Sequence, residues 1–453
     1  MRTSFALISA LAATAFAAPS KNQFDSFWRR DKTSKGFTVA RPGDVSDIII
    51  TDENTLNGTY HGPHTTVVHK MQANAVPGNL ALEMVNHFGS NVNAYIQGKD
   101  SDNKIVFVGA GGSLIYPSSG GSEVPVPVTE PIAVPMGDLD STSTINLPIA
   151  LISGRVYFCE GELQFFMVKA GDGDGLVQPS VNNIADPASG LNWGFVELTY
   201  TTDLALYANI SYVDFVGMIL SMQLTNTDGS QQLTKGLDAG AVNEICGELS
   251  NQQGADGLPW ASMCIAGGNG SPIRVLAPAD YSSIDPNSFA NYWSDYVDQV
   301  WAKYTNEPLM INTQTDAGIV NCQVSGDTLN CAGDNRGFTK PSATDIWGCN
   351  GGPFGRLDGD SGIHIAVIPR LCAAFTRSTL LIEGGNTQPG PPATSYYQNS
   401  PTSHYSRILH QFEVDGRGYT FSYDDVNPDG NDNASGTVAS GNPQTLTVWI
   451  GGY

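Results

Sequence analysis

Short segments in which apolar and polar residues alternate, separated by turn residues, constrain the fold of this chain more than any other feature. Five of them lie between Gly36 and Val108 and read DIIIT, TTVVHKM, LALEMVNHF, VNAYIQGK and KIVFVG. An alternation of period two is typical of half-buried β-strands, and Gly, Pro, Asn and Asp are typical of the turns between them. Further strands are predicted at INLPIALI, RVYFC, ELQFFMVKA, IHIAVIP, STLLI, YTFSY and LTVWI. The sequence therefore predicts a mainly β fold, either a sandwich or a barrel.

Helical patterns interrupt the strands in the middle of the chain. Apolar residues recur at helical spacing over residues 239–249, and a stronger pattern runs from Pro286 to Tyr304 behind Asp285 as the cap. We therefore expect a mixed α/β domain over residues 223–350, inserted into a β-barrel domain made of residues 31–222 and 351–453.

The first 30 residues read as segments that are removed during secretion. Arg2, an apolar run from Phe5 to Phe16 and the small-residue site Ala15-Phe16-Ala17 predict a signal peptide over residues 1–17, because the apolar run is too short to span a membrane. Arg29-Arg30 resembles a dibasic processing site and predicts a pro-segment over residues 18–30. The alternative is that both arginines are ordinary surface residues. We expect a secreted, extracellular protein.

The charge balance limits the partners. The 453 residues carry a formal net charge of −22, and removing residues 1–30 leaves 18 basic and 43 acidic residues, a net charge of −25. Such a surface repels phosphate backbones and anionic lipid, so nucleic acid and membranes are not expected partners. A neutral polymer or a small neutral ligand is favoured, and we expect a monomer.

Seven cysteines imply disulfides in a secreted chain, with one residue left over. Cys322 and Cys331 flank a predicted hairpin turn, and proximity in sequence favours the pairs Cys246–Cys264 and Cys349–Cys372. Cys159 lies in the apolar strand RVYFC and is predicted to be a buried free thiol. Asn57, Asn269 and Asn433 are candidate glycosylation sites, whereas the sequon at Asn209 lies in mid-strand, where we expect it to be buried and unused.

Residues Asn192 to Asp214 hold the candidate catalytic groups. Alternation places Glu197 on a strand, a second run carries Asp214, and the surrounding sequence has aromatic and hydroxyl side chains but no Lys or Arg. Two such carboxylates are suited to acid/base cleavage of a sugar bond, and the alternative is that both are merely solvated. A simple hairpin would separate them by about 20 Å at about 3.3 Å per residue. A bend, a bulge or a non-hairpin connection is therefore required.

Five segments together resemble glycoside hydrolase family 64, the secreted β-1,3-glucanases of thaumatin-like fold. They are RVYFCEGELQFF, GLVQPSVNNIADP, NWGFVELTY, LYANISYVDF and ILHQFEVDGRGYTFSYDDV, and the resemblance runs from about Leu80 to Tyr453. It leaves residues 31–79 unplaced. It implies a thaumatin-like β-barrel or sandwich domain beside a mixed α/β domain, with a wide groove between them. The implied activity is endo-acting, inverting hydrolysis of β-1,3-glucan, with Glu197 as general acid and Asp214 as general base.

The expected substrate contacts follow from position around this pair. Thr199 and Thr201 share the strand face of Glu197, and Trp193, Tyr200 and Gln178 are further candidates. We expect no cofactor and no metal, since the Asp/Gly-rich segments lack the spacing of a calcium loop. A non-catalytic thaumatin-like protein that binds glucan or acts in defence is the alternative function.

Overall fold

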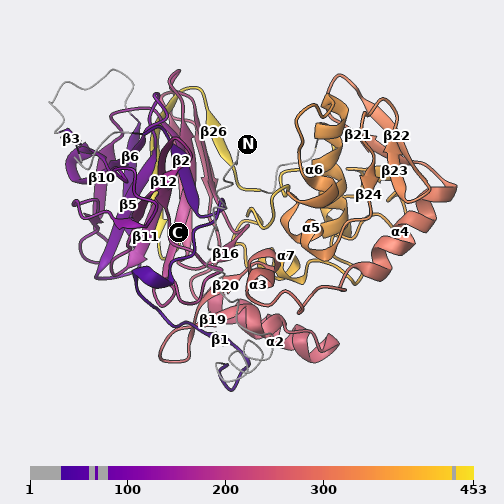
Figure 1. The fold of residues 1–453 in the computed structure, drawn as a ribbon, viewed down its shortest axis with the longest axis horizontal. Helices are drawn as coiled ribbons and strands as arrows, with labels where there is room; N and C mark the ends of the chain where they lie inside the picture. Colours follow the sequence, from indigo (N-terminus) through magenta and orange to yellow (C-terminus); the bar gives the residue numbers. More distant parts are fainter. Residues whose placement is uncertain (1–31, 61–66, 70–79, 431–434) are drawn as a thin grey trace, which may run out of the picture.

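The structure, a computed structural model, describes residues 32–60, 67–69, 80–430 and 435–453. The predicted signal peptide, the pro-segment and the Asn433 sequon lie outside these residues. Figure 1 shows two lobes, one built mainly of sheets and one of helices around a small sheet. We call them the β lobe and the mixed lobe. One hydrophobic cluster of buried residues includes members of both lobes, among them Val196 and Phe375.

The largest sheet forms the centre of the β lobe. Its strand order is β26-β15-β14-β11-β5-β6-β7-β3, and β9 pairs with β5. The strands are β3 (Val67–His69), β5 (Val92–Lys99), β6 (Ile105–Val108), β7 (Leu114–Tyr116), β9 (Val134–Pro135), β11 (Leu151–Glu160), β14 (Trp193–Tyr200), β15 (Leu206–Ile210) and β26 (Val438–Ser440).

Two smaller sheets accompany the largest one. The first has the order β10-β4-β27-β17-β18, and its strands β17 and β27 bring residues about 220 positions apart side by side. Its members are β4 (Ala81–Asn86), β10 (Thr142–Asn146), β17 (Leu220–Asn226), β18 (Gln231–Thr234) and β27 (Pro443–Ile450). The second has the order β2-β13-β12-β8, with β2 (Thr55–Gly58), β8 (Val126–Pro127), β12 (Phe166–Ala170) and β13 (Gly173–Val177). All three sheets are open in the described residues, so the expected barrel is not formed there.

A four-stranded sheet and three helices lie between the lobes (Figure 1). The sheet has the order β1-β19-β20-β16. Its strands are β1 (Thr38–Val39), β16 (Phe215–Val216), β19 (Cys264–Ala266) and β20 (Pro272–Leu276), and the helices are α2 (Ala241–Asp256), α3 (Pro278–Ile284) and α7 (His404–Leu409).

The mixed lobe packs helices on a five-stranded sheet of order β24-β23-β22-β21-β25. Its elements are α4 (Ser294–Asn306), β21 (Leu309–Asn312), β22 (Ile319–Ser325), β23 (Thr328–Cys331), β24 (Phe338–Thr339), α5 (Ala343–Gly348), α6 (Gly362–Thr376) and β25 (Thr387–Gln388). Short 3-10 helices complete the chain at η1 (Val45–Asp47), η2 (Ala110–Gly112), η3 (Trp260–Met263), η4 (Gly352–Phe354) and η5 (Ala393–Ser395). The predicted mixed domain over residues 223–350 includes β18, which lies in a β-lobe sheet. The predicted β-barrel segment over residues 351–453 includes α6, which contacts β21 of the mixed lobe. The domain boundaries stay a prediction.

Several predicted elements differ from the structure. IHIAVIP is not a strand but part of α6, because Ser361 caps the helix by accepting a hydrogen bond from the His364 N–H and the run is buried on nearly all sides. The helix predicted over residues 286–304 begins only at Ser294, and α3 ends before it at Ile284. STLLI and YTFSY form turns rather than strands. The helix predicted over 239–249 and the strand LTVWI are confirmed as α2 and β27.

The cysteine predictions are confirmed. Disulfides join Cys246 to Cys264, Cys322 to Cys331 and Cys349 to Cys372. The remaining thiol, Cys159, is free and buried on β11. The sequon residues Asn57 and Asn269 are exposed.

Candidate active site

The central strand β14 forms the floor of the candidate site. It pairs with β11 on one side and with β15 on the other, and the register places Arg155, Glu197 and Asn209 directly opposite one another on three adjacent strands. Paired residues project from the same face of a sheet. The next positions along β14, Val196 and Leu198, project from the other face and are buried. The alternation that predicted the strand therefore places the Glu197 side chain on the accessible face of the sheet.

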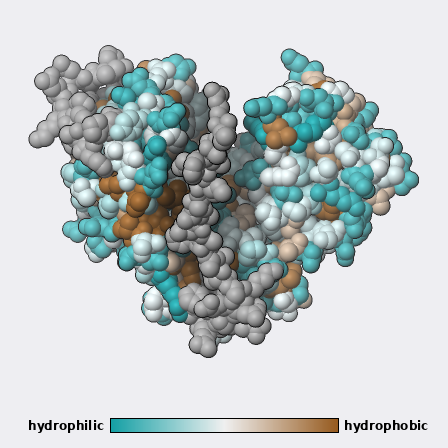
Figure 2. Space-filling view, viewed as in Figure 1, coloured by the Kyte–Doolittle hydropathy of each residue, from teal (hydrophilic) through white to brown (hydrophobic). Residues whose placement is uncertain are grey.

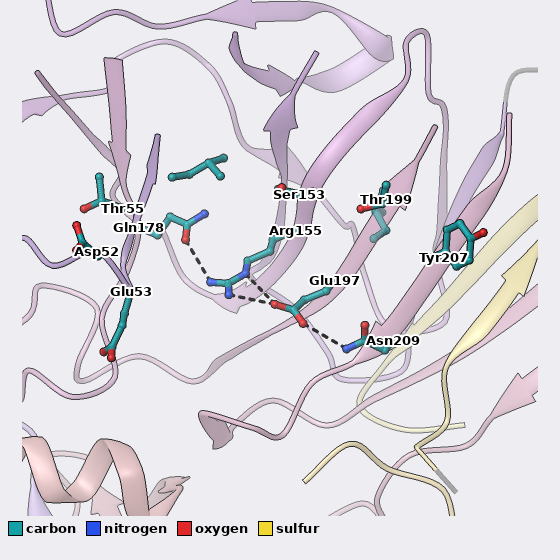
Figure 3. Close-up of a pocket in the computed structure, with 13 residues that line it drawn as sticks. Asp52, Glu53, Thr55, Ser153, Arg155, Gln178, Glu197, Thr199, Tyr207 and Asn209 are labelled. Atoms are coloured by element: carbon teal, nitrogen blue, oxygen red, sulfur yellow. Dashed lines mark hydrogen bonds and ion pairs between the residues drawn. The ribbon is translucent and has the colours of Figure 1, made fainter. Parts of the chain in front are cut away.

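Arg155 holds the carboxyl group of Glu197 from one side. Its Nε and Nη2 atoms donate to Glu197 Oε1 at 3.2 and 3.0 Å, while its Nη1 donates to Gln178 Oε1 at 3.2 Å. Asn209 Nδ2 donates to the second oxygen, Glu197 Oε2, at 3.3 Å. Figure 3 shows these contacts. The stretch from Asn192 to Asp214 contains no Lys or Arg, but β11 brings Arg155 to Glu197 from 42 positions earlier in the chain.

Asp214 reaches the site because the chain leaves β15 after Ile210. An unbroken hairpin register would place Trp193 opposite Val213, but the Trp193 carbonyl instead accepts a hydrogen bond from Met218 N–H at 3.0 Å. Five extra residues are therefore looped out, and Asp214 lies within them, just before β16. This break in register after the β14–β15 hairpin is the departure from a simple hairpin that the spacing of the two carboxylates requires.

The environment of Asp214 is crowded with acidic groups. Burial raises its pKa above the ordinary aspartate value, the guanidinium of Arg155 opposes the shift, and the negative charges of Glu197 and Glu53 add to it. Among the hydrogen bonds of the described residues, none joins Asp214 to Glu197. The two carboxyl groups therefore interact through their charges and not through a direct hydrogen bond.

A third acidic residue, Asp280, comes from α3. The helix is tied to the same loop, because the Ala277 N–H donates to the Asp214 carbonyl at 2.8 Å. Burial holds the pKa of Asp280 well above its ordinary value, the charges of Asp214 and Glu53 add to the effect, and a hydrogen bond from Asn182 opposes it. No local pattern in the sequence marks Asp280 as a site residue, since its role depends on a contact across 66 positions.

Two pockets meet at this point. The first holds about 480 Å³ and is lined by Glu197, Thr199, Gln178 and Asn209 among others. The second holds about 340 Å³ and is lined by Asp214, Asp280 and residues of α5 in the mixed lobe. Glu53 and Arg155 line both pockets. Figure 2 shows a notch between the two lobes. Because the two pockets share residues, they form one groove that is lined by β14 of the β lobe and by α5 of the mixed lobe.

The predicted substrate contacts separate into two groups. Thr199 and Gln178 line the first pocket. Tyr200 is 2% exposed and projects into the core on the opposite face of β14, so its predicted contact with substrate is wrong. Trp193 is 1% exposed and packs against Phe215 beneath the second pocket. Its ring therefore supports the wall of that pocket and offers a sugar almost no accessible surface. Thr201 exchanges hydrogen bonds with Ala205 in the β14–β15 turn.

Sequence reasoning missed Glu53, Arg155, Asn209 and Asp280 as site residues. Asn209 carries a glycosylation sequon, yet it is half-buried and hydrogen-bonded to Glu197.

In the described part of the chain, no group of three or more His, Cys, Asp or Glu side chains is arranged to hold a metal ion. No helix among the described residues has the length and apolar character needed to cross a membrane.

Comparisons with known proteins agree on one family. The family model described as β-1,3-glucanase, of glycoside hydrolase family 64, matches residues 78–450. Glucan endo-1,3-β-glucosidases of Cellulosimicrobium cellulans and Arthrobacter sp. (strain YCWD3) are each 29% identical over 384 residues, which covers 83% of this chain and 66% of theirs. The chain thus spans about two thirds of the length of these relatives.

The solved structures agree with the sequence comparison. A laminaripentaose-producing β-1,3-glucanase in complex with laminaritetraose superposes with a TM-score of 0.71 at 27% identity, covering 83% of this chain and 99% of its own. A β-1,3-glucanase domain from Clostridium beijerinckii, 22% identical and covering 84% of this chain and 100% of its own, shares the fold with a TM-score of 0.62. Because the family model covers most of the sequence, this chain belongs to glycoside hydrolase family 64.

Proposed function

We propose that the protein is a secreted, endo-acting glycoside hydrolase that cleaves β-1,3-glucan with inversion of configuration. The observation that carries the proposal is the meeting of Glu197 and Asp214 in one groove, from two segments that a plain hairpin would keep apart. The related structure with bound laminaritetraose supports the same class of substrate. A neutral glucan also suits a chain with a net charge of −22, because it is not repelled by the acidic surface.

In the proposed mechanism, Glu197 is the general acid. It protonates the glycosidic oxygen of the leaving sugar, and Arg155 and Asn209 hold its two carboxyl oxygens in position. Once the proton has left, the guanidinium of Arg155 stabilises the carboxylate that remains. Asn209 orients the same group from the β15 side.

Asp214 is the proposed general base. It accepts a proton from the water that attacks the opposite face of the sugar, and inversion needs about 6.5 to 9.5 Å between the two carboxyls to leave room for that water. Asp214 acts in its ionised form. Because its pKa is raised, activity is expected to fall as the pH drops through a range above that of an ordinary aspartate.

The finer assignments extend this proposal. The fold is proposed to be thaumatin-like, as the resemblance implies, with the glucan running along the groove between the lobes. Thr199 and Gln178 are proposed sugar contacts because they line the first pocket next to Glu197. The three disulfides support folding in an oxidising, extracellular compartment.

The first prediction concerns the two carboxylates. Replacing either one, as Glu197→Gln or Asp214→Asn, should lower the release of reducing ends from linear β-1,3-glucan by about 100- to 10,000-fold, because one proton transfer is lost. Proton magnetic resonance should show the α-anomer first from the wild type. Glu123→Gln, which removes an exposed carboxylate paired with Lys169 on the surface, is the matched control and should retain full activity.

Two outcomes would overturn the proposal. A wild-type protein that binds β-1,3-glucan without releasing oligosaccharide would support the non-catalytic binding function instead. Normal hydrolysis by both variants would show that the catalytic pair lies elsewhere, and a β-anomer as first product would exclude inversion.

A further inference from the structure

A short N-terminal segment lines the groove although it precedes the region matched by the family. The family model begins at residue 78, whereas Thr51–Leu56 contributes to both pockets. Asp52, Glu53, Thr55 and Leu56 line the first pocket, and Thr51, Glu53 and Asn54 line the second. We call residues 51–56 the N-terminal wall.

Backbone pairing fixes the N-terminal wall in place. Strand β2 pairs antiparallel with β13, with Thr55 opposite Val177, and the Gln178 N–H donates to the Asn54 carbonyl at 2.8 Å. The buried side chain of Asn54 closes the turn, since it accepts from Thr51 N–H at 2.9 Å and donates to the Ile49 carbonyl at 2.8 Å. The wall is thus a built part of the groove rather than a loosely attached tail.

The wall is connected to the candidate catalytic residues on both sides. Gln178, whose backbone it holds, accepts a hydrogen bond from Arg155, and Arg155 in turn holds Glu197. Asn182 Nδ2 lies 3.5 Å from both Glu53 Oε2 and Asp280 Oδ1. Figure 3 shows the two groups on opposite sides of the pocket, with Asp52, Glu53 and Thr55 on one side and Glu197, Thr199 and Asn209 on the other.

Glu53 occupies the junction of the two pockets. Its side chain is exposed, and it stands near Asp214 and Asp280, whose pKa values its charge helps to raise. The negative charges of Asp214 and Asp280 repel a carboxylate at this position. Its oxygens are, however, strong acceptors for sugar hydroxyl groups, and hydrogen bonds to an ionised group are about twice as strong as neutral ones. A glucan that runs from one pocket to the other has to pass this side chain.

We propose that Glu53 is a substrate-binding residue, and that the N-terminal wall is a side of the glucan groove that this chain adds ahead of its family region. The inference rests on the proposed function, because it names a contact in the same groove. It assigns to residues 51–56 a role in holding sugar hydroxyls opposite Glu197.

Binding in an inactive background tests the contact directly. Full-length Glu197→Gln should bind a laminari-oligosaccharide about tenfold more tightly than the double variant Glu197→Gln/Glu53→Gln, measured by calorimetry, since a hydrogen bond to a charged group contributes about 1.5 to 3 kcal/mol and 1.4 kcal/mol is tenfold. Glu197→Gln/Glu123→Gln is the control and should bind like the single variant. Equal affinity of all three proteins would overturn the inference.

Kinetics in the active protein give a second readout that a merely structural role would not move. Glu53→Gln should raise KM for β-1,3-glucan more than it lowers kcat, and should shift the acidic limb of the kcat/KM profile to lower pH, because a negative charge near Asp214 is removed. Glu53→Asp should keep the limb near its wild-type position. Wild-type inactivity would refute the proposed function, whereas an active wild type with an unchanged Glu53→Gln variant would refute the wall alone.

Discussion

Arg155 is the residue on which the electrostatics of the candidate site depend. Its guanidinium bonds to Glu197 through two nitrogens, lies 4.4 Å from the centre of the Phe195 ring, and opposes the rise in the pKa of Asp214. The fixed fork of Arg matches a carboxylate in a way that the ammonium of Lys does not. Arg155 thus acts on both carboxylates: its hydrogen bonds orient Glu197, and its positive charge limits the rise in the pKa of Asp214.

Substitutions of Arg155 separate these two effects. Arg155→Lys should lower kcat by about 10- to 100-fold, since 1.5 to 3 kcal/mol of charged hydrogen bonding is lost, yet leave the acidic limb of the pH profile near its wild-type position. Arg155→Met should lower kcat similarly and also move the limb to higher pH, because the positive charge is gone. The check is kcat and kcat/KM measured from pH 3 to 8, and identical limbs in the two variants would contradict the electrostatic role.

At the scale of elements, α3 places the buried carboxyl group of Asp280 in the groove. Asp280 has a pKa well above its unfolded value, so the folded state binds a proton that the unfolded state has released. Its contribution therefore makes the protein less stable as the pH rises from about 4 through the folded pKa. Sites that need such groups commonly trade stability for function.

Asp280→Asn should remove this destabilisation. We expect the variant to melt a few degrees higher than the wild type at pH 7 and to show no difference near pH 3, where both states of the wild type are protonated. Thermal unfolding followed by circular dichroism at the two pH values checks this. Glu123→Gln, on the exposed surface, should show no gain at either pH, and an equal gain at both pH values for Asp280→Asn would point to packing instead.

At the scale of the whole molecule, a buried ionic cluster joins the C-terminal segment to Arg377 at the end of α6. His410 contacts Glu413 at 2.9 Å and Asp424 at 3.2 Å, and Arg377 contacts Asp424 at 3.0 Å. Asp424 and Glu413 raise the pKa of His410 to about 10 against the opposing effect of burial. The same segment reaches the Asp214 loop, because the Tyr212 N–H donates to the Tyr419 carbonyl.

Replacing His410 should unfold the protein more easily. His410→Ala leaves the buried carboxylate of Glu413 without its ionic partner, whereas Asp424 keeps Arg377, and we expect a loss of about 3 to 5 kcal/mol at neutral pH. In the wild type the contribution of His410 is fully present below about pH 6.5 and is lost as the pH rises through about 10, since the folded pKa lies above the unfolded one. Urea unfolding at pH 6, 8 and 10 measures this. Lys340→Gln, which breaks a surface pair with Asp298, should cost less than about 1 kcal/mol.

Local patterns determined what depends on neighbours in the chain. The alternation around Glu197 predicted β14, and the order of five short segments identified the family. A hairpin turn and proximity in sequence predicted the three disulfides, and an apolar strand predicted the free, buried Cys159. The same patterns failed at IHIAVIP, because five of its seven residues are buried in the helix α6 and a short, mostly apolar run has too little periodicity to separate a strand from a helix.

Contacts between distant segments decided the rest. The pairing of β11 with β14 placed Arg155 on Glu197, the five residues looped out after β15 brought Asp214 into the groove, and α3 added Asp280. Residues 51–56 had no family pattern to place them, and only the pairing of β2 with β13 shows that they line the site. The sequence by itself thus determined β14, the disulfides and the family, and it singled out Glu197 and Asp214 as catalytic candidates. Tertiary structure decided their charges and their neighbours, because burial and Coulomb interactions depend on distance in space rather than on position in the chain.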